Sequence, residues 1–489
     1  MNRPVRRVAL AVMIMVVALL ANVTYVQVVM AGQYRDDPRN QRTQIDEYSR
    51  QRGQITGGGQ VLAQSVESEG RLRYQRQYPN GPAFAPVTGF LSTVYGSGGL
   101  ERSADEVLNG TDDRLFVRRL SDLITGREPA GGNVVTTIDP QVQQVAYDRM
   151  NSQDFTGAVV ALEPRTGDIL GMVSTPSYDP NPLAAPDAGA QQDAWREYNN
   201  AEPSPLVNRA ISEIEPPGST FKLVTTAAAL QNGFTPDSRL TAAPDLTLAD
   251  STTTLENYNG STCGGGATAS LREALARSCN TAFAQLGQEV GADKLRAQAE
   301  AFGIGRTDLQ IPMPVTASQV GPMEDTPSTQ QSAIGQRDVR LTPMQLAMIG
   351  ASIANGGQTM APHLIQEIQG ATLDTVDTTE PDRMARSMPA DVAGTLTDLM
   401  LGSEERTQGG GKITGVRIAS KTGTAEHGTD PKNTPPHAWY VAFAPAEDPK
   451  VAVAVLVQNG GNRALEATGG SVAAPIGRAV IGEALRDAQ

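Results

Sequence analysis

The N-terminal end of the chain carries one long apolar run behind a short basic stretch. Three arginines lie within the first seven residues, and an apolar segment extends from about residue 8 to 31. A helix rises about 1.5 Å per residue, so about 20 such residues cross a hydrocarbon core of roughly 30 Å. Because basic residues collect on the inner side of a membrane, the pattern predicts a single-pass anchor with the N-terminus cytoplasmic and the bulk extracytoplasmic. A signal peptide cleaved near Ala18 or Ala21 is the alternative.

A different pattern begins near residue 154. Two apolar runs separated by a Pro-Arg-Thr-Gly turn indicate a hairpin of buried strands. Alanine-rich helical stretches follow, and two further strands and a helix close the chain. These elements are expected as strands at 157–162, 169–173, 439–444 and 451–457 and as helices at 220–231, 271–287, 342–355 and 473–484. Strands at both ends with helices between them predict one mixed sheet with a helical subdomain, an α/β (α+β mixed) fold.

The stretch between the anchor and this part has shorter elements. Residues 34–64 are polar and arginine-rich and contain Gly57-Gly58-Gly59, which favours short strands or irregular structure. A helical stretch at 111–126 and a β-rich run at 134–138 follow, and Asp139-Pro140 is typical of a helix start. A chain of 489 residues predicts two or three folded units, and the lack of a 20–50-residue repeat in the sequence excludes solenoids and propellers.

The charge balance argues against nucleic acid as a partner. The formal net charge is −13 and the sequence pI about 4.9, whereas a nucleic-acid surface needs a basic patch that displaces counterions. The three histidines, His363, His427 and His437, have no metal-ligand spacing in the sequence. We therefore expect neither a metal nor a cofactor.

Cys263 and Cys279 are the two cysteines of the chain. Outside the membrane oxidation is permitted, which favours a disulfide; two reduced buried thiols or a reactive cysteine are the alternatives. A bridge would close a loop of about 16 residues and contribute on the order of 3 kcal/mol in the chain-entropy model.

Ser219 stands at the start of a helical run, behind the stiff turn Pro216-Pro217-Gly218. Free N–H groups and the helix dipole at such a position favour developing negative charge. Lys222 lies one turn later on the same face, and a desolvated lysine there could accept the hydroxyl proton. Ser-x-x-Lys alone is common, and a serine N-cap beside a solvated lysine is the simpler explanation.

Two further motifs change that assessment. Ser278-Cys279-Asn280 lies in the second alanine-rich helical region, and Lys421-Thr422-Gly423-Thr424 lies at the end of a β-like run at 415–420. Together and in this order the three motifs match the signature of penicillin-binding proteins and serine β-lactamases. The chain resembles class B penicillin-binding proteins, most closely the penicillin-binding protein A type of actinobacteria.

The resemblance covers nearly the whole chain beyond the anchor. Further matching runs are Arg52-Gly53-Gln54-Ile55, Gly89-Phe90, Gly99-Leu100-Glu101, Ala333-Ile334-Gly335-Gln336, Thr342-Pro343-Met344-Gln345 and His437-Ala438-Trp439-Tyr440. Two departures lie outside the catalytic motifs. Gly57-Gly58-Gly59 replaces the usual continuation of Arg-Gly-x-Ile, and Arg337 stands where a glycine is usual.

The resemblance implies three parts: a cytoplasmic tip and transmembrane anchor at 1–31, an N-terminal pedestal (dimerisation-type) domain at 32–153, and a transpeptidase domain at 154–489. The last would have the penicilloyl-serine transferase or β-lactamase-like fold, with an antiparallel sheet and a helical subdomain. The implied activity is peptidoglycan D,D-transpeptidation of stem peptides ending in D-Ala-D-Ala. It would proceed through an acyl-enzyme at Ser219 and be inhibited by β-lactams.

The resemblance also implies catalytic roles. Ser219 is the nucleophile and Lys222 its base. Ser278 relays a proton toward the leaving amine, and Asn280 holds Lys222 and a substrate amide.

The third motif is expected to bind substrate. Lys421 would hold Ser278 and the substrate carboxylate, with help from the hydroxyls of Thr422 and Thr424. Gly423 would let the strand approach the substrate. Backbone N–H groups of Ser219 and Thr424 would form the oxyanion hole.

Other functions could use the same residues. A D,D-carboxypeptidase, a β-lactamase and a β-lactam-binding sensor would share the triad. The sequence contains no Glu-x-x-Leu-Asn segment of the β-lactamase type, and one apolar span instead of the several that sensors carry. The expected partners are stem peptides, β-lactams and, by resemblance, a polytopic glycan polymerase reached through anchor and pedestal.

Overall fold

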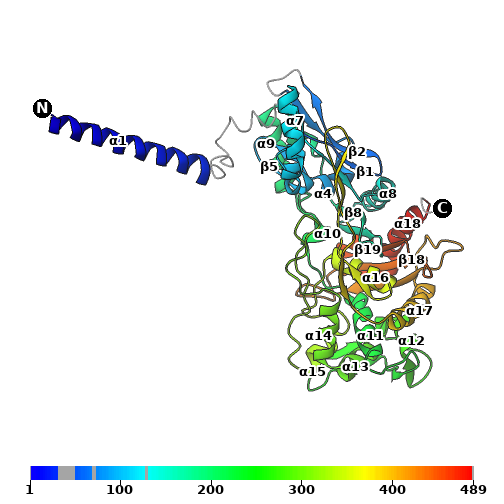
Figure 1. Ribbon diagram of the computed structural model, residues 1–489. Helices are drawn as coiled ribbons and strands as arrows, with labels where there is room; N and C mark the ends of the chain where they lie inside the picture. The colour runs from blue at the N-terminus through cyan, green and yellow to red at the C-terminus, as the bar shows by residue number, and fades with distance from the viewer. Residues whose placement is uncertain (1, 31–49, 69–72, 127–129, 487–489) are drawn as a thin grey trace.

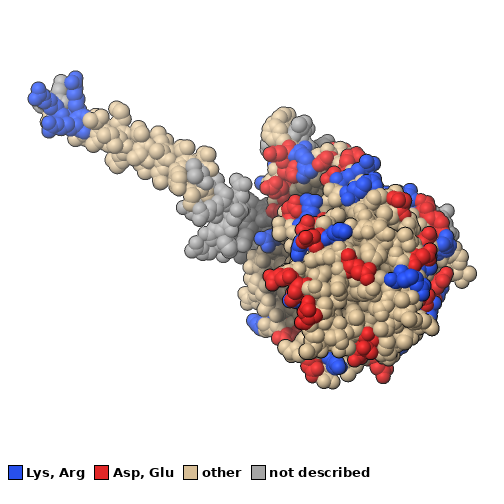
Figure 2. Space-filling model, turned by 90° about the horizontal axis from the view of Figure 1, so that it is seen from below, with Lys and Arg blue, Asp and Glu red and all other residues tan. Residues whose placement is uncertain are grey.

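The computed structural model describes residues 2–30, 50–68, 73–126 and 130–486, so the expectation for 34–49 lies outside the described residues. Helix α1 (Asn2–Thr24) continues into a π-helical turn, η1 (Tyr25–Val29), and extends away from the folded body (Figure 1). Over Arg3–Val28 it is long and apolar enough to cross a membrane, and it buries none of its most apolar window. Figure 2 shows basic residues gathered at its N-terminal tip. This helix fits a single-pass membrane anchor.

A five-stranded antiparallel sheet forms the centre of the C-terminal part, in the order β17-β18-β19-β7-β8. Its strands are β7 (Gly157–Leu162), β8 (Ile169–Thr175), β17 (Ala419–Ala425), β18 (His437–Ala444) and β19 (Val451–Val457). Strands from both ends of this part meet because β19 pairs with β7. The predicted mixed fold, one sheet with a helical subdomain, is confirmed.

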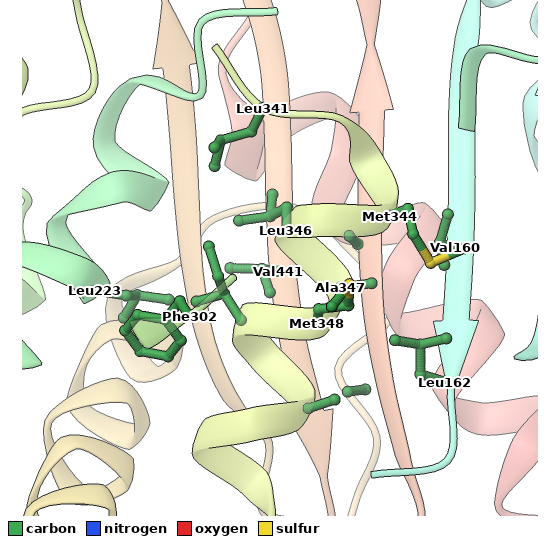
Figure 3. Packing of buried hydrophobic residues seen from close by; sticks show 14 of the residues in the cluster. Val160, Leu162, Leu223, Phe302, Leu341, Met344, Leu346, Ala347, Met348 and Val441 are labelled. Carbon is green, nitrogen blue, oxygen red and sulfur yellow. The ribbon is translucent and has the colours of Figure 1, made fainter. Parts of the chain in front are cut away.

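Both faces of this sheet are buried, which explains why β7, β18 and β19 are almost entirely apolar. Successive residues of a strand point to opposite faces. Tyr440 accordingly belongs to the core beneath α8 (Pro140–Asn151) and α18 (Ala474–Ala484), and Val441 to the core beneath α16 (Pro343–Ala354). In Figure 3, Leu346 of α16 lies beside Val441 and Met344 beside Val160 of β7.

A helical subdomain lies on the α16 side of the sheet, below it in Figure 1. Its helices are α11 (Lys222–Leu230), α12 (Leu271–Arg277), α13 (Asn280–Val290), α14 (Ala292–Ala301), α15 (Thr326–Ser332) and α17 (Ala390–Arg406). The prediction of one helix over 271–287 is wrong. Ser278 adopts φ 61° and ψ 39°, a left-handed conformation that ends α12, and α13 starts anew two residues later.

Short elements connect these layers. Helical ones are η3 (Asn181–Ala184), α9 (Ala188–Asn200), α10 (Arg209–Ser212), η4 (Gly218–Phe221), η5 (Tyr258–Gly260), η6 (Gln458–Glu466) and η7 (Gly469–Ala473). Two-stranded pairs are β9 (Arg239–Thr241) with β12 (Thr268–Ser270), β10 (Asp245–Thr247) with β11 (Thr254–Glu256), and β13 (Gln358–Met360) with β16 (Arg383–Arg386).

The N-terminal part is built on a second sheet, in the order β15-β14-β6-β1-β2-β3. Its strands are β1 (Ile55–Gly57), β2 (Gln60–Glu67), β3 (Tyr74–Gln77), β6 (Asn133–Thr136), β14 (Ile365–Gln369) and β15 (Thr375–Thr378). The associated elements are α4 (Gly81–Thr88), β4 (Leu91–Ser92), β5 (Gly96–Ser97), α5 (Gly99–Ser103), α6 (Asp105–Leu108), η2 (Asp113–Leu115) and α7 (Phe116–Thr125).

The two parts exchange elements across the predicted boundary at 153/154. Strands β14 and β15 come from the C-terminal part of the sequence but extend the N-terminal sheet, since β14 pairs with β6. Helix α8 precedes residue 153 but packs on the C-terminal sheet. The domain boundary therefore stays a prediction.

A buried charge cluster in the N-terminal part links the segment that starts at Arg52 to the segment that ends at Glu101, both of which carry the family resemblance. Glu101 is fully buried and forms ion pairs with Arg52 at 2.7 Å and Arg76 at 2.5 Å. The hydroxyl of Tyr78 donates to the same carboxylate at 3.2 Å. Although burial acts to raise the pKa of Glu101, the two guanidinium groups lower it below its ordinary value. The cluster fixes the start of β1 against α5.

Candidate active site

Ser219 lies in η4, the 3-10 turn that leads directly into α11. Its side chain is partly exposed, while its neighbours Gly218 and Thr220 are buried. The Ser219 hydroxyl has no hydrogen-bond partner among the described residues. A serine at the start of a helix, with its hydroxyl uncommitted, is placed to attack an electrophile near free N–H groups.

Glycine contacts hold the turn that carries Ser219. Gly218 has φ +52° and donates its N–H to Gly335 O at 3.0 Å. A Cβ on Gly335 would lie 2.1 Å from Gly218 O, so no larger residue fits there. The indole N–H of Trp439 donates to Pro216 O at 2.8 Å. The turn that carries Ser219 is therefore held on one side by Trp439 of the sheet and on the other by Gly335.

Lys222 is fully buried one turn beyond Ser219. Its Nζ donates to Ser278 O at 2.7 Å and to Asn280 Oδ1 at 2.8 Å, and lies 3.4 Å from Ser278 Oγ. Burial, assisted by the positive charge of Lys421, lowers the pKa of Lys222 well below its ordinary value. A lysine whose pKa is lowered gives up its proton more easily than a solvated one, so it can serve as a proton acceptor.

The Ser278-Cys279-Asn280 segment occupies the break between α12 and α13. The left-handed conformation of Ser278 is uncommon for a residue with a side chain and is strained. Cys279 forms a disulfide with Cys263. The amide of Asn280 is fixed on its other side, because Nδ2 donates to Glu256 O at 2.9 Å. The segment is thus held by a covalent link and by hydrogen bonds.

Lys421 approaches Ser278 from the opposite side. It is fully buried, and its Nζ donates to Ser278 Oγ and to Thr422 O, both at 2.9 Å. Burial lowers the pKa of Lys421 from its ordinary value to about 7. The Ser278 hydroxyl therefore lies between two amines with lowered pKa values, an arrangement that can pass a proton.

The Lys421–Thr424 motif lies inside β17, so its expected position at the end of a strand over 415–420 is wrong. Gly415 has φ +80° and belongs to a turn, and β17 starts only at Ala419. A Cβ on Gly423 would lie 2.6 Å from Pro217 O, so the strand passes directly over the turn that carries Ser219.

The two threonines of the motif differ in their contacts. Thr424 Oγ1 accepts a hydrogen bond from Gly469 N at 3.4 Å. The Thr422 hydroxyl is partly exposed and has no hydrogen-bond partner in the described part of the chain. The predicted roles of both hydroxyls stay predictions.

Gln336 is a site residue that the sequence shows only as the last residue of the run Ala333-Ile334-Gly335-Gln336, with no role attached. Its side-chain amide faces the backbone of Glu426. With the amide assigned in the orientation that satisfies both groups, it donates to Glu426 O and accepts from Glu426 N, both at 3.2 Å. Glu426 follows β17 directly, so the amide extends the pairing of the strand that carries Thr424. Next to it, Arg337 has φ +61°. This left-handed backbone explains why glycine is usual at that position.

Two histidines lie at the end of this strand. His427 and His437 stack with ring centroids 3.8 Å apart, and His437 Nε2 lies 3.3 Å from Glu215 Oε2. His437 is the first residue of β18, so this strand begins two residues before the expected 439. Across the described ranges, no group of three or more His, Cys, Asp or Glu side chains could hold a metal ion.

The chain matches known proteins in both sequence and structure. The family model described as penicillin binding protein transpeptidase domain matches residues 157–482, and that of the penicillin binding protein A dimerisation domain matches 52–134. Over 490 residues the chain is 60% identical to peptidoglycan D,D-transpeptidase PbpA of Mycolicibacterium smegmatis, covering 100% of both chains. It is 56% identical to the protein of that name from Mycobacterium tuberculosis, covering 99% of both.

Solved structures of penicillin-binding protein A also match this chain. The ceftriaxone acyl-enzyme complex of penicillin-binding protein A from M. tuberculosis matches with a TM-score of 0.89 at 57% identity, covering 90% of this chain and 100% of that one. The penicillin G acyl-enzyme complex of the same protein matches with a TM-score of 0.87 at 56% identity, covering 89% of this chain and 100% of that one.

Proposed function

This chain belongs to the penicillin-binding protein transpeptidases, and we propose that it is a peptidoglycan D,D-transpeptidase that uses Ser219 as its nucleophile. Its substrates are stem peptides ending in D-Ala-D-Ala, and β-lactams acylate the same serine. The observation that carries the proposal is the Ser278 hydroxyl between two buried amines, 3.4 Å from Lys222 Nζ and 2.9 Å from Lys421 Nζ, with an uncommitted serine, Ser219, at the nearby helix start. Full-length relatives at 60% and 56% identity that bear the D,D-transpeptidase name support it.

In the acylation step, Ser219 Oγ attacks the carbonyl of the penultimate D-Ala. Lys222, with its lowered pKa, takes the hydroxyl proton. N–H groups of Ser219 and Thr424 receive the oxyanion, and each such donor is worth roughly 3–4 kcal/mol in comparable enzymes.

Departure of the terminal D-Ala requires a proton on its amine. The Ser278 hydroxyl supplies this proton. It then takes a proton from a neighbouring lysine ammonium group, since the hydroxyl lies between Lys222 and Lys421. Asn280 keeps Lys222 in place. Lys421, with Thr422 and Thr424, binds the substrate carboxylate. An acceptor amine then attacks the acyl-enzyme carbonyl, a new amide bond forms, and Ser219 recovers its proton.

The test is incubation of the full-length protein with a D-Ala-D-Ala stem peptide, with and without an acceptor amine. A cross-linked product that forms only with the acceptor supports the transpeptidase. Free acid alone, even with acceptor present, would indicate a D,D-carboxypeptidase. Acylation without any product turnover would indicate a β-lactam-binding sensor.

The anchor and the N-terminal domain hold the catalytic domain at the outer side of the membrane. Residues 1–31 anchor the protein with the N-terminus in the cytoplasm, 32–153 form the pedestal, and 154–489 form the extracytoplasmic catalytic domain. A polytopic glycan polymerase is the membrane partner, contacted through anchor and pedestal. Protease protection of the N-terminal tip in inverted and right-side-out vesicles tests the orientation. Failure of the two proteins to co-purify from membranes that contain both would contradict the partnership.

A further inference from the structure

Helix α7 of the N-terminal part presents an apolar stripe to solvent. Phe116, Leu120 and Ile124 are 57%, 48% and 77% exposed, whereas most large apolar side chains of the folded parts are buried. Their spacing of four residues places them on one face of the helix. Arg119, beside the stripe, donates to the carbonyls of Thr111 and Gly110, and its guanidinium lies over the ring of Phe116, 5.9 Å from the centroid. These contacts hold the start of the helix against residues 110–111.

The residues that flank α7 are bonded to residues 51–53, where the chain enters the folded body from the anchor. Gly53 N donates to Leu108 O at 2.8 Å, and Gly131 N donates to Gln51 O at 2.9 Å. Residues 108 and 131 bracket α7, so the helix projects from the point at which the tether arrives. The stretch between residues 30 and 50, fully extended, spans at most about 70 Å. The anchor therefore limits the distance between the membrane and the start of α7 to at most about 70 Å.

The size of the apolar stripe favours a membrane surface over a protein as its binding partner. One row of three side chains offers a few hundred Å², less than the roughly 800 Å² per partner of a stable protein interface. A tethered helix needs only weak affinity for a membrane, because the tether supplies a high local concentration of lipid.

We propose that α7 lies on the membrane surface with Phe116, Leu120 and Ile124 inserted at the boundary of headgroups and acyl chains. The inference rests on the proposal that α1 is the membrane anchor. Acidic and basic residues balance along 112–125, so the apolar stripe, and not net charge, carries the contact. The contact orients the pedestal, and with it the catalytic domain, relative to the membrane plane.

The test uses full-length protein in protein-free phosphatidylcholine vesicles. Ile124→Cys is labelled with an environment-sensitive fluorophore; the native cysteines form a disulfide and do not compete. Brominated lipid tails should quench this label several-fold more than the same label at Leu465→Cys, a 54% exposed hydrophobic position in η6. Phe116→Ser with Leu120→Ser should abolish the difference, while penicillin acylation stays within about twofold of wild type.

Each other outcome overturns the inference. Equal quenching at 124 and 465 would show that α7 stays in water. Protection of position 124 in native membranes but not in protein-free vesicles would assign the stripe to a protein partner. Failure of the chain to float with vesicles would overturn both the anchor and the inference. Penicillin acylation, measured in the same samples, reports separately on the proposed enzymatic function.

Discussion

The carbonyl oxygen of Ser278 lies 2.7 Å from Nζ of Lys222. This contact depends on a backbone conformation and not only on a side chain, because Ser278 adopts φ 61° at the end of α12. The same conformation leaves its hydroxyl 2.9 Å from Nζ of Lys421. Ser278, with its strained backbone, thus contacts the buried amines of both Lys222 and Lys421. Backbone strain of this kind is commonly found at functional sites.

The first prediction concerns the charge at Asn280. Asn280→Asp places a carboxylate where Oδ1 lies 2.8 Å from Lys222 Nζ, and this should raise the pKa of Lys222. Acylation needs the neutral amine, so its rate rises as pH increases through that pKa. The rise should therefore move to higher pH and the rate at pH 7 should fall about tenfold or more. Stopped-flow acylation by a fluorescent penicillin between about pH 6 and 10 measures it, a range that spans the ordinary pKa of lysine.

Asn280→Ser is the neutral control for this shift. It weakens the support of Lys222 without adding charge, so its rate should fall while its pH midpoint stays below that of Asn280→Asp. Identical pH profiles for the two variants would contradict the role of Lys222 as the base.

The second prediction concerns Gln336. Gln336→Ala removes two hydrogen bonds to Glu426, each worth about 1 kcal/mol. The acylation rate should fall about tenfold because the strand carrying Thr424 loses its support, while the melting temperature changes little. Gln336→Glu keeps the acceptor but not the donor and should be intermediate. Gln331→Ala, five residues earlier in α15, serves as the control. An unchanged rate in Gln336→Ala would exclude a positioning role.

The third prediction concerns the disulfide. Cys263→Ser with Cys279→Ser should lower the free energy of unfolding by about 3 kcal/mol, since the bridge closes a loop with a sequence separation of 16. Reductant should lower the melting temperature of the wild type and leave that of the variant unchanged. Differential scanning fluorimetry with and without reductant measures both. Equal effects of reductant on the two proteins would contradict the bridge.

The fourth prediction concerns the buried cluster around Glu101. Glu101→Gln removes the anion that Arg76 pairs with and leaves Arg52 only its ion pair with Asp105, and should lower the free energy of unfolding by about 3–5 kcal/mol. The pKa of Glu101 is below its ordinary value, so the stabilisation is present at neutral pH and is lost as pH falls through the lowered pKa. Glu106→Gln, at an exposed position nearby, should have little effect. Chemical denaturation distinguishes the two.

The sequence was sufficient to predict β7, β18 and β19 of the central sheet because these strands are buried on both faces. Continuous apolar runs such as 451–457 have few alternatives to a central strand, and the observed β19 has the same bounds. The helix expected over 271–287 failed because its break depends on tertiary contacts. Ser278 is held in the left-handed region by the disulfide of its neighbour and by Lys222, and helix propensity contains neither.

Motif residues were found more easily than the residues that support them. The order of three short motifs singled out Ser219, Ser278 and Lys421 without any structure. Gln336 acts through the backbone of Glu426, and backbone contacts leave no local pattern in one sequence. The exchange of β14 into the N-terminal sheet is likewise a long-range pairing that no local pattern encodes.

The most direct test of the central claim is to locate the acyl group. Purified protein is incubated with penicillin G, digested and examined by tandem mass spectrometry, with Ser219→Ala and Ser278→Ala treated in parallel. The account predicts one penicilloyl adduct on Ser219, none in Ser219→Ala, and a slowly formed adduct still on Ser219 in Ser278→Ala. An adduct of undiminished yield in Ser219→Ala, or an adduct on any other residue of the wild type, would contradict it.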